Sequence, residues 1–565
     1  MKMRQNIYMS GIRREKRKSN IGSLFKLSFI IAFFLLFIAL WVIEGRNFTS
    51  ALDYVFSKKN IIIYDTFTVS FDESIATDYK DSVVQNLEKL EFNGKRRFEI
   101  EEGGADIELS RTEEEDSKEI FSKRLIPVGH VYSLLEGIKE EDLANYNIFV
   151  LDSVYSSYLK EEYGIDVTVS NSYEELVTIL EVDDMNVGLI DLYDIDFRVK
   201  VLEMDEKYYF DDMDACIPIR LFAVFDKKVD DFILSVLVKN IDNQDTVFDM
   251  EELVKINMSG VVAISRALAS KIDKSGDYGY PAREIGGFLA NADLTHISNE
   301  VSFVPGCSTY SGMRFCSRPE YIKVLEDSGV DIVELTGNHN NDYGSIYSTE
   351  TIEKYKSLGM RYFGGGLDEV DASRILYEEV KGTKVAFVGY NYYDTIYRSL
   401  ALAGEERSGA NSYSDEKVKS DIEEAKKNAS IVIVTFQFQE CYSYPDSDVI
   451  YPICYKPLSN PDQKDVFRKA IDYGANIVVG TQAHQPQTYE LYGDGVIYYG
   501  LGNLYFDQNM WIGTRQGLIL THYFYKGEHI QTKLVPIFLG SDLIPRLATQ
   551  EQGDQLLELL KDARE

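Results

Sequence analysis

Residues 329–344 read GVDIVELTGNHNNDYG, an apolar run that ends abruptly in glycine, asparagine and histidine. The apolar part has the length and β-branched content of a buried strand. Asn338 and His339 follow directly, where the chain leaves the sheet and its side chains become exposed. The stretch therefore predicts an α/β fold that presents functional side chains at the end of a strand.

Two more polar clusters follow apolar runs in the same way, one after ADLTHIS (292–298) and one after IVVG (477–480). The three clusters supply the following candidates: Asn299, Glu300, Asn338, His339, Gln482 and His484. A two-metal hydrolase needs carboxylate, amide and imidazole groups that converge on cations about 3.5–4 Å apart. We therefore predict that the three loops meet in a single pocket.

The first folded region, about 55–248, alternates strand and helix patterns. Strands are predicted at 60–70, 105–111, 148–153, 165–170 and 187–192, and helices at 79–90 and 173–180. This alternation predicts an α/β unit with a mostly parallel sheet. Residues 242–252 are polar and acidic, which is typical of a linker between domains.

The N-terminus has the pattern of a membrane anchor. Leu27–Ile43 is an unbroken apolar run at the short end of what can span a bilayer as a helix, and a basic cluster precedes it. By the positive-inside rule residues 1–26 stay in the cytoplasm, so the bulk of the chain lies outside the cell membrane. A cleavable signal peptide is the alternative, although the run is long for one and no clear small-residue cleavage site follows.

Charge limits the partners of the chain. The formal net charge is −33, and the first 46 residues are basic, so the remainder is more acidic still. Such a body repels polyanions, which excludes nucleic acid as an expected partner. An anionic substrate needs a metal ion or a local basic pocket in order to bind.

Five cysteines fit an oxidising compartment. Cys307 and Cys316 flank a Ser/Gly/Tyr loop, and Cys441 and Cys454 flank a Pro- and Tyr-rich one, so each pair is a candidate disulfide. Free thiols are the alternative for both pairs, and Cys216 is left over in either case.

The second region, 253–545, resembles the CapA-type proteins of poly-γ-glutamate capsule synthesis, a family related to calcineurin-like metallophosphoesterases. Beside residues 329–344, five segments carry the resemblance in family order: INMSGVVAISRALASKI (256–272), ADLTHISNEVSF (292–303), YKSLGMRYFGGG (355–366), YGANIVVGTQAHQPQ (473–487) and GVIYYGLGNLYFDQ (495–508). The resemblance implies an α/β/β/α sandwich with a site on loops at strand ends. A C-terminal helix is predicted after this domain, at 546–565.

The resemblance also implies roles for the candidate residues. His339 and Glu300 stand as catalytic groups, and Asn299, Asn338, His339 and His484 as metal ligands. Four further residues are expected to contact these groups and hold them in place without binding the metal themselves: Asp342, Gln437, Glu440 and Gln482. His296 lies inside a strand pattern and is interpreted as a core or supporting residue.

Three positions depart from the family pattern. Val261 stands where an aspartate is usual, and Gln437 and Gln482 stand where histidines are expected. Neutral amides bind transition metals poorly. The sequence therefore predicts no full dinuclear centre and leaves open one hard divalent cation, such as Mg²⁺ or Ca²⁺, or none.

Each candidate also has a plain structural interpretation. Asn338 and Asn340 can hold a turn, His339 and His484 can be buried hydrogen-bonded histidines, and Glu300 can be a surface charge. The region 55–248 bears a weaker, pattern-level resemblance to phosphate-type periplasmic solute-binding domains, in which an anion sits on helix N-termini.

Two functions follow as expectations. In the first, the chain is a membrane-anchored surface protein with a metal-dependent hydrolase-like site that acts in synthesis, export or processing of a poly-γ-glutamate-type polymer. In the second, it keeps the fold but only binds an anionic polymer or phosphate during assembly. Both involve an anionic surface polymer, and other capsule-assembly proteins are candidate partners.

Overall fold

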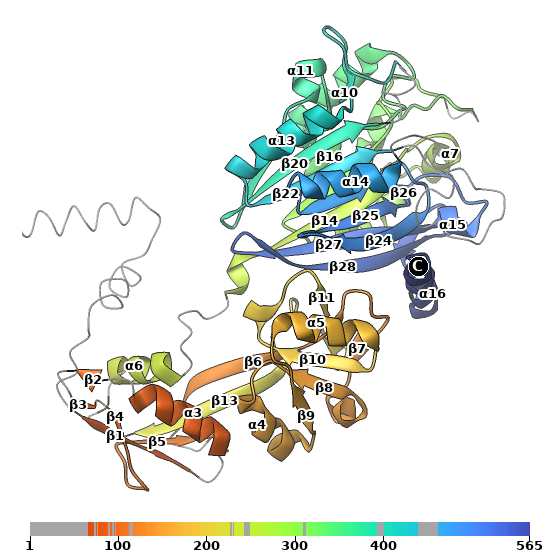
Figure 1. Cartoon of the computed structure of the whole chain (residues 1–565). Helices are drawn as coiled ribbons and strands as arrows, with labels where there is room; N and C mark the ends of the chain where they lie inside the picture. The colour runs from red at the N-terminus through yellow and green to blue at the C-terminus, as the bar shows by residue number, and fades with distance from the viewer. Residues whose placement is uncertain are drawn as a thin grey trace, which may run out of the picture. The chain divides into compact units, whose positions relative to one another are not determined.

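The computed structural model describes residues 66–564 except 73–74, 76, 89–90, 93–94, 97, 112, 114–116, 226–228, 230, 242–248, 309–311, 393–399 and 439–461. The predicted cytoplasmic tail and anchor, Glu440, and the second cysteine pair lie outside the described residues. Within the described part, no helix is long and apolar enough to cross a membrane. The chain divides into two compact units (Figure 1).

Three parallel strands and two helices form the main part of the smaller unit that the structure describes. Strand β1 (Phe67–Phe71) pairs with β4 (Phe98–Ile100) on one side and β5 (Ile107–Ser110) on the other. The helices are α3 (Thr77–Glu88) and α6 (Asp231–Ile241). The helix predicted at 79–90 and the strand predicted at 105–111 are thereby confirmed.

The larger unit begins with an α/β lobe. Its strands include β6 (Lys118–His130), β8 (Asn147–Val150), β9 (Val167–Val169), β10 (Asn186–Ile190), β11 (Val199–Val201) and β13 (Ile217–Phe225). Its helices are α4 (Val154–Tyr163) and α5 (Tyr173–Val182), and Ser172 caps α5 by accepting a hydrogen bond from Glu175 N. The three strands β10, β8 and β9 are parallel, but β6 runs antiparallel to β10 and β11, so the sheet is mixed.

Two further sheets form the rest of the larger unit. The first has the order β17 (Arg361–Phe363), β16 (Ile332–Glu334), β15 (Leu294–Asn299), β14 (Leu253–Val262), β27 (Gln516–Tyr525), β28 (Glu528–Leu539) and β29 (Pro545–Leu547), with β26 (Asn503–Tyr505) beside β14. The second has the order β19 (Leu376–Val380), β20 (Thr383–Asn391), β22 (Ile431–Gln437), β23 (Ile477–Gly480), β25 (Gly495–Leu501) and β24 (Pro486–Tyr492).

The two sheets pack face to face, with helices outside. Ile256 and Ile332 of the first sheet share one buried cluster with Phe387 and Ile433 of the second. A second cluster joins the outer face of the first sheet to α7 (Arg266–Ser275) and α10 (Ser345–Ser357). A third joins the second sheet to α13 (Asp415–Asn428) and α14 (Gln463–Asp472), as Figure 1 shows. The α/β class is confirmed, and the layers are helix, sheet, sheet, helix.

The C-terminal helix α16 (Gln550–Asp562) lies within the segment for which a helix is predicted. It starts at a capping box, in which Thr549 and Gln552 satisfy each other's backbone N–H groups. Leu556 and Leu560 join the cluster between the two sheets. The helix therefore belongs to the folded body of the larger unit.

Candidate functional site

Several strands in each sheet are parallel, so their carboxyl ends lie at a common edge of that sheet. Strands β14, β15, β16 and β26 are parallel in the first sheet, and β20, β22, β23 and β25 are parallel in the second. Two side-chain bonds join the sheets at their carboxyl ends. Thr481 Oγ1 donates to Glu334 Oε1 at 2.9 Å, and Asn391 Nδ2 donates to the Thr336 carbonyl at 2.8 Å. The loops that carry the predicted residues all leave from this edge.

The loop after β15 lies directly against the loop after β16. A Cβ atom on Gly337 would lie 2.6 Å from Glu300 Cα, so only glycine permits this approach. Ser302 Oγ donates to the Asn340 carbonyl at 2.6 Å. Glu300 is 1% exposed, which rules out the interpretation of this residue as a surface charge.

The asparagines of these loops have different tasks. Asn299 Nδ2 donates to the Val301 carbonyl and to the Tyr355 hydroxyl, so its amide holds the backbone in place. Asn340 Nδ2 donates to two carbonyls of its own turn, as its structural interpretation predicts. Asn338 differs, because its Oδ1 atom is buried and makes no hydrogen bond within the described part of the chain.

His339 is held by a carboxylate. Its Nδ1 lies 2.7 Å from Asp342 Oδ2, and the same oxygen accepts a hydrogen bond from Phe315 N at 2.7 Å. Because a carboxylate only accepts, Nδ1 carries the proton and Nε2 is the free ring nitrogen. Nε2 makes no hydrogen bond to any residue that the structure describes. His339 is thus oriented as a proton-transfer group would be, and its catalytic role stays a prediction.

His484 is held by an amide. Asn503 Nδ2 donates to the carbonyls of His484 and Thr514, which fixes its Oδ1 as the acceptor for His484 Nδ1 at 2.9 Å. Burial lowers the pKa of His484 to about 4; the bond to Asn503 opposes this shift, and the nearby His339 and Arg266 add to it. His484 is therefore neutral at pH 7, with the lone pair on Nε2.

The two glutamines that replace expected histidines lie together. Gln437 Nε2 donates to Gln482 Oε1. Gln437 Oε1 is buried and has no hydrogen-bond partner among the described residues. A second buried acceptor without a donor therefore lies at the end of β22. Asn391 of β20 pairs with Gln437 and donates to the Thr336 carbonyl, in the loop that leads to Asn338. Glu440 lies outside the described residues.

An arginine in the site was not anticipated from the sequence. Arg266 binds the carboxylate of Asp507 through Nε at 3.1 Å and also through Nη2, and its guanidinium lies over the rings of Phe315 and Phe506. Asp507 also caps α7 by accepting from Ala267 N at 3.0 Å. Arg266 has a φ of +46°, a strained conformation for a residue with a side chain. The signal was the Asp in YFDQ (505–508), which follows a strand in the same way as the other clusters.

A buried ionisable pair also escaped the sequence reasoning. Glu334 is fully buried and accepts hydrogen bonds from Thr336 and Thr481, and His296 Nε2 lies 3.2 Å from its other oxygen. His296 is fully buried, which confirms its interpretation as a core residue. A lone glutamate inside the apolar run VDIVEL was the available signal, because a buried charge needs partners.

The side chains of this edge that the structure describes do not supply the ligands of a dinuclear transition-metal centre. Among the described residues, no group of three or more His, Cys, Asp and Glu side chains is arranged to hold a metal ion. The donor set consists instead of amide oxygens of Asn338 and Gln437, the Glu300 carboxylate beside Gly337, and one neutral imidazole. Oxygen donors of this kind suit a hard cation.

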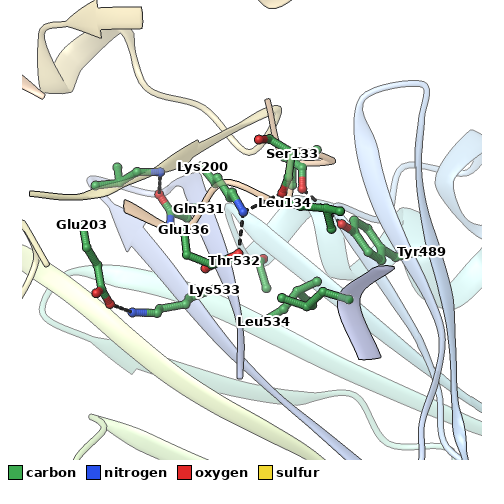
Figure 2. Close-up of a pocket in the computed structure, with 13 residues that line it drawn as sticks. Ser133, Leu134, Glu136, Lys200, Glu203, Tyr489, Gln531, Thr532, Lys533 and Leu534 are labelled. Carbon is green, nitrogen blue, oxygen red and sulfur yellow. Dashed lines mark hydrogen bonds and ion pairs between the residues drawn. The ribbon is translucent and has the colours of Figure 1, made fainter. Parts of the chain in front are cut away.

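A cavity elsewhere in the larger unit has a different character. It has a volume of about 30 Å³, room for about one water molecule, and lies between the α/β lobe and β28 (Figure 2). Its charged groups are already paired: Lys200 binds Glu136 at 2.6 Å, and Lys533 binds Glu203 at 3.0 Å. This cavity is part of the packing and not a ligand site.

The fold and the site define a two-sheet α/β sandwich with polar loops at one carboxyl edge. Residues 255–508 match the family model described as bacterial capsule synthesis protein PGA_cap. This region of the chain belongs to the PGA_cap, or CapA-type, family.

Two curated relatives are similar to the chain. The capsule biosynthesis protein CapA of Bacillus anthracis is 25% identical over 295 residues, which are 51% of this chain and 67% of that protein. The PGA biosynthesis protein CapA of Bacillus subtilis (strain 168) is 30% identical over 219 residues, which are 39% and 53%. The matches thus span about two thirds and about half of these relatives.

Solved structures give only partial likenesses. A putative 5'-nucleotidase from Staphylococcus aureus is 14% identical, covers 55% of this chain and 58% of its own, and has a TM-score of 0.30. An ABC-type phosphate transport receptor from Vibrio cholerae is 12% identical, covers 31% and 93%, and has a TM-score of 0.23. Both scores lie below 0.5, so no assignment rests on them.

Proposed function

We propose that this chain takes part in the synthesis, export or processing of an anionic surface polymer of the poly-γ-glutamate type. Family membership of residues 255–508 and the printed names of both relatives support this role. The site that acts on the polymer is the carboxyl edge of the sandwich, where the loops after β15, β16, β22 and β23 emerge.

The observation that carries the proposal is the pair of buried oxygen acceptors without donors, Asn338 Oδ1 and Gln437 Oε1. A buried acceptor without a hydrogen bond costs free energy on the order of 1–3 kcal/mol, so a partner is expected at each. One hard divalent cation, Mg²⁺ or Ca²⁺, meets the chemistry of both, with Glu300 as the charged ligand. Bound there, it supplies positive charge that polarises an anionic substrate.

The local charges explain why a cation is needed. Arg266 is neutralised by Asp507. Arg314 donates to the backbone carbonyl of Asp342, which adds a carboxylate to the same site. With Glu300 added, the site is not a basic pocket, and the whole chain carries a formal net charge of −33. An anionic polymer would be repelled by such a surface unless a bound cation offsets it.

His339 is the proposed proton carrier. Asp342 fixes the proton on Nδ1, so Nε2 is the atom that accepts or delivers a proton at the reacting group. His484 is neutral because burial keeps its pKa at about 4, and it lies close enough to His339 for that residue to lower its pKa further. Asn299 holds the loop that carries Glu300 and is a supporting residue in this scheme.

The test uses the full-length chain in detergent with poly-γ-glutamate of defined length. Mg²⁺ or Ca²⁺ is expected to permit shortening or transfer of the polymer, measured by light scattering after gel filtration, and chelator or His339→Gln is expected to abolish it. His529→Gln, a buried histidine on β28, is the matched control and should retain activity. Absence of both polymer binding and processing, with the cation present, would overturn the proposal.

A second function is favoured by the amide pair Gln437–Gln482, which replaces two imidazoles. In this version the edge binds the polymer or a phosphate group without catalysis and serves in assembly. It predicts that the polymer raises the melting temperature equally with and without chelator. A melting temperature that no anionic ligand changes would exclude it.

The location of the protein is proposed from the sequence and one bond. Residues 27–43 anchor the chain in the bacterial cell membrane by a single helix, with the N-terminus in the cytoplasm and the remainder outside. The Cys307–Cys316 disulfide supports an oxidising location. Other capsule-assembly proteins are the proposed partners. Accessibility of the C-terminus to added protease in intact cells tests the orientation.

A further inference from the structure

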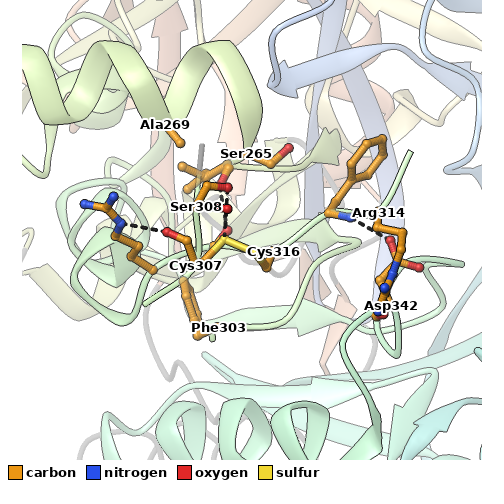
Figure 3. The surroundings of a disulfide bond; sticks show 12 residues. Ser265, Ala269, Phe303, Cys307, Ser308, Arg314, Cys316 and Asp342 are labelled. Carbon is orange, nitrogen blue, oxygen red and sulfur yellow. Dashed lines mark hydrogen bonds between the residues drawn. A yellow bond between two sulfur atoms is a disulfide. The ribbon is translucent and has the colours of Figure 1, made fainter. Parts of the chain in front are cut away.

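We propose that the Cys307–Cys316 disulfide positions the Asp342–His339 pair, so that the ring of His339 is correctly held only while this bond is intact. The inference rests on His339 belonging to the site of the proposed function, while its test reads the ring directly. Figure 3 shows the disulfide at one end of the segment from Arg314 to Cys316 and the contact between Arg314 and Asp342 at the other end.

The first link is a run of hydrogen bonds from the segment before Cys316 to the histidine. Phe315 N donates to Asp342 Oδ2 at 2.7 Å, and Arg314 Nε donates to the Asp342 carbonyl at 3.0 Å. The same Oδ2 accepts from His339 Nδ1 at 2.7 Å. Arg314 and Phe315, the two residues directly before Cys316, therefore hold both the backbone and the side chain of Asp342 in place.

The second link is aromatic packing. The Phe315 ring lies 4.1 Å from the His339 ring, centroid to centroid, and 5.9 Å from Phe506. Arg266 lies over Phe315 at 4.6 Å and over Phe506 at 4.8 Å. Phe315 is thus the common neighbour of His339 and the Arg266 pair, and its displacement moves both.

The third link is what holds Phe315. Both cysteines are buried, against Val304, Tyr343 and Tyr347. On the far side of the disulfide the chain is well anchored, since Arg318 Nε donates to the Cys307 carbonyl at 2.9 Å and Ser317 Oγ to the Ile264 carbonyl at 2.7 Å. Met313, on the other side of Phe315, is 75% exposed. The disulfide ties Cys316, the residue next to Phe315, to Cys307. In the proposal, cutting this cross-link lets Arg314 and Phe315 shift away from Asp342.

The consequence is a change of tautomer at His339. The carboxylate acceptor at Nδ1 keeps the proton there, so Nε2 faces the site with its lone pair when the ring is neutral. Without a fixed Asp342 the proton is no longer held at Nδ1. The disulfide thus acts on proton transfer through Asp342, as a positioning element that touches no substrate.

The experiment is ¹⁵N NMR of the full-length chain with labelled histidine, at a pH where the rings are neutral. His339 is assigned with His339→Gln, and Asp342→Asn shows the signal of a released ring. The Nδ1–H form of His339 is expected in the wild type and in Cys216→Ser, the matched control, and is expected to be lost in Cys307→Ala/Cys316→Ala. His484, held by Asn503, should keep its signal and reports that the fold is intact.

Retention of the Nδ1–H form in Cys307→Ala/Cys316→Ala would overturn the proposal. If His484 also loses its signal, the double variant has unfolded, and Arg314→Ala and Phe315→Ala in the chain with its disulfide intact then decide. Loss of the Nδ1–H form in either supports the positioning path, and retention in both refutes it. Polymer and metal assays test the proposed function separately, because neither reads the tautomer.

Discussion

The two sheets of the sandwich meet at one edge, but their loops contribute different kinds of side chain to it. Loops of the first sheet contribute Glu300 and the His339–Asp342 pair, which are ionisable groups. Loops of the second sheet contribute the Gln437–Gln482 amide pair and a neutral His484. The difference teaches that the ionisable groups are concentrated on the loops of one sheet, while the loops of the other sheet offer neutral oxygen and nitrogen atoms. Three changes test this division, from the largest expected effect to the smallest.

Glu334→Ala removes the carboxylate that accepts the hydrogen bond from Thr481 and so joins the two sheets. The carboxylate is fully buried, accepts from Thr336 and Thr481, and lies 3.2 Å from His296 Nε2. Its removal leaves buried polar groups without partners, so we expect the free energy of unfolding to fall by about 4 kcal/mol. Urea denaturation measures this loss. Glu353→Ala, at an exposed glutamate on α10, should change the free energy of unfolding by less than about 0.5 kcal/mol. An equally small change in Glu334→Ala would show that Glu334 does not hold the two sheets together.

His484→Gln tests the neutral imidazole of the second sheet. The pKa of His484 is lowered to about 4 in the folded chain and is 6.5 ordinarily, so the unfolded chain binds the proton first. Stability from this residue is complete above pH 6.5 and is lost as the pH falls toward 4. We expect a loss of about 2 kcal/mol between pH 6.5 and pH 4.5 that is missing in the variant.

The pH dependence is read as the difference between the two chains, because His130 and His529 also have pKa values lowered to about 4 by burial. Denaturation midpoints at several pH values give the two profiles. Parallel profiles would show that His484 takes up its proton as readily when folded as when unfolded.

Gln437→His/Gln482→His converts the amide pair into an imidazole pair. Imidazole is a better ligand than an amide for Mn²⁺ and Zn²⁺, so we expect these ions to bind at least about tenfold more tightly. Isothermal titration calorimetry measures the change. Gln550→His, on the surface of α16, is the control and should leave the affinity as it was. Unchanged affinity in the double variant would mean that the second sheet does not face the cation.

Sequence patterns predicted the strand ends well, because an apolar run followed by Asn, His or Glu marks both the strand and its exposed loop. They also anticipated His296 in the core and the Cys307–Cys316 pair. They missed Arg266 and Phe315, since one starts a helix and the other ends a disulfide loop, and neither position follows an apolar run. Only tertiary packing brings Phe315 to His339 and Arg266 to Phe315.

The sequence pattern predicted where these side chains lie but did not distinguish their roles. Asn299 and Asn338 occupy equivalent positions in the sequence pattern, yet the Asn299 amide donates to the backbone whereas Asn338 Oδ1 has no partner in the described residues. The difference depends on Tyr355, which lies 56 residues away and accepts from Asn299. Hydrogen-bond partners at such separations are set by the fold and leave no local trace in the sequence.

The central proposal is that the carboxyl edge binds one hard cation through Asn338 and Gln437. Calorimetric titration of chelator-treated, full-length protein with Mg²⁺ or Ca²⁺ tests it most directly. We predict one ion per chain, binding that is lost in Asn338→Ala/Gln437→Ala, and binding that is kept in Asn428→Ala, an exposed asparagine on α13. No binding by the unaltered chain, or equal binding by the double variant, would contradict the account.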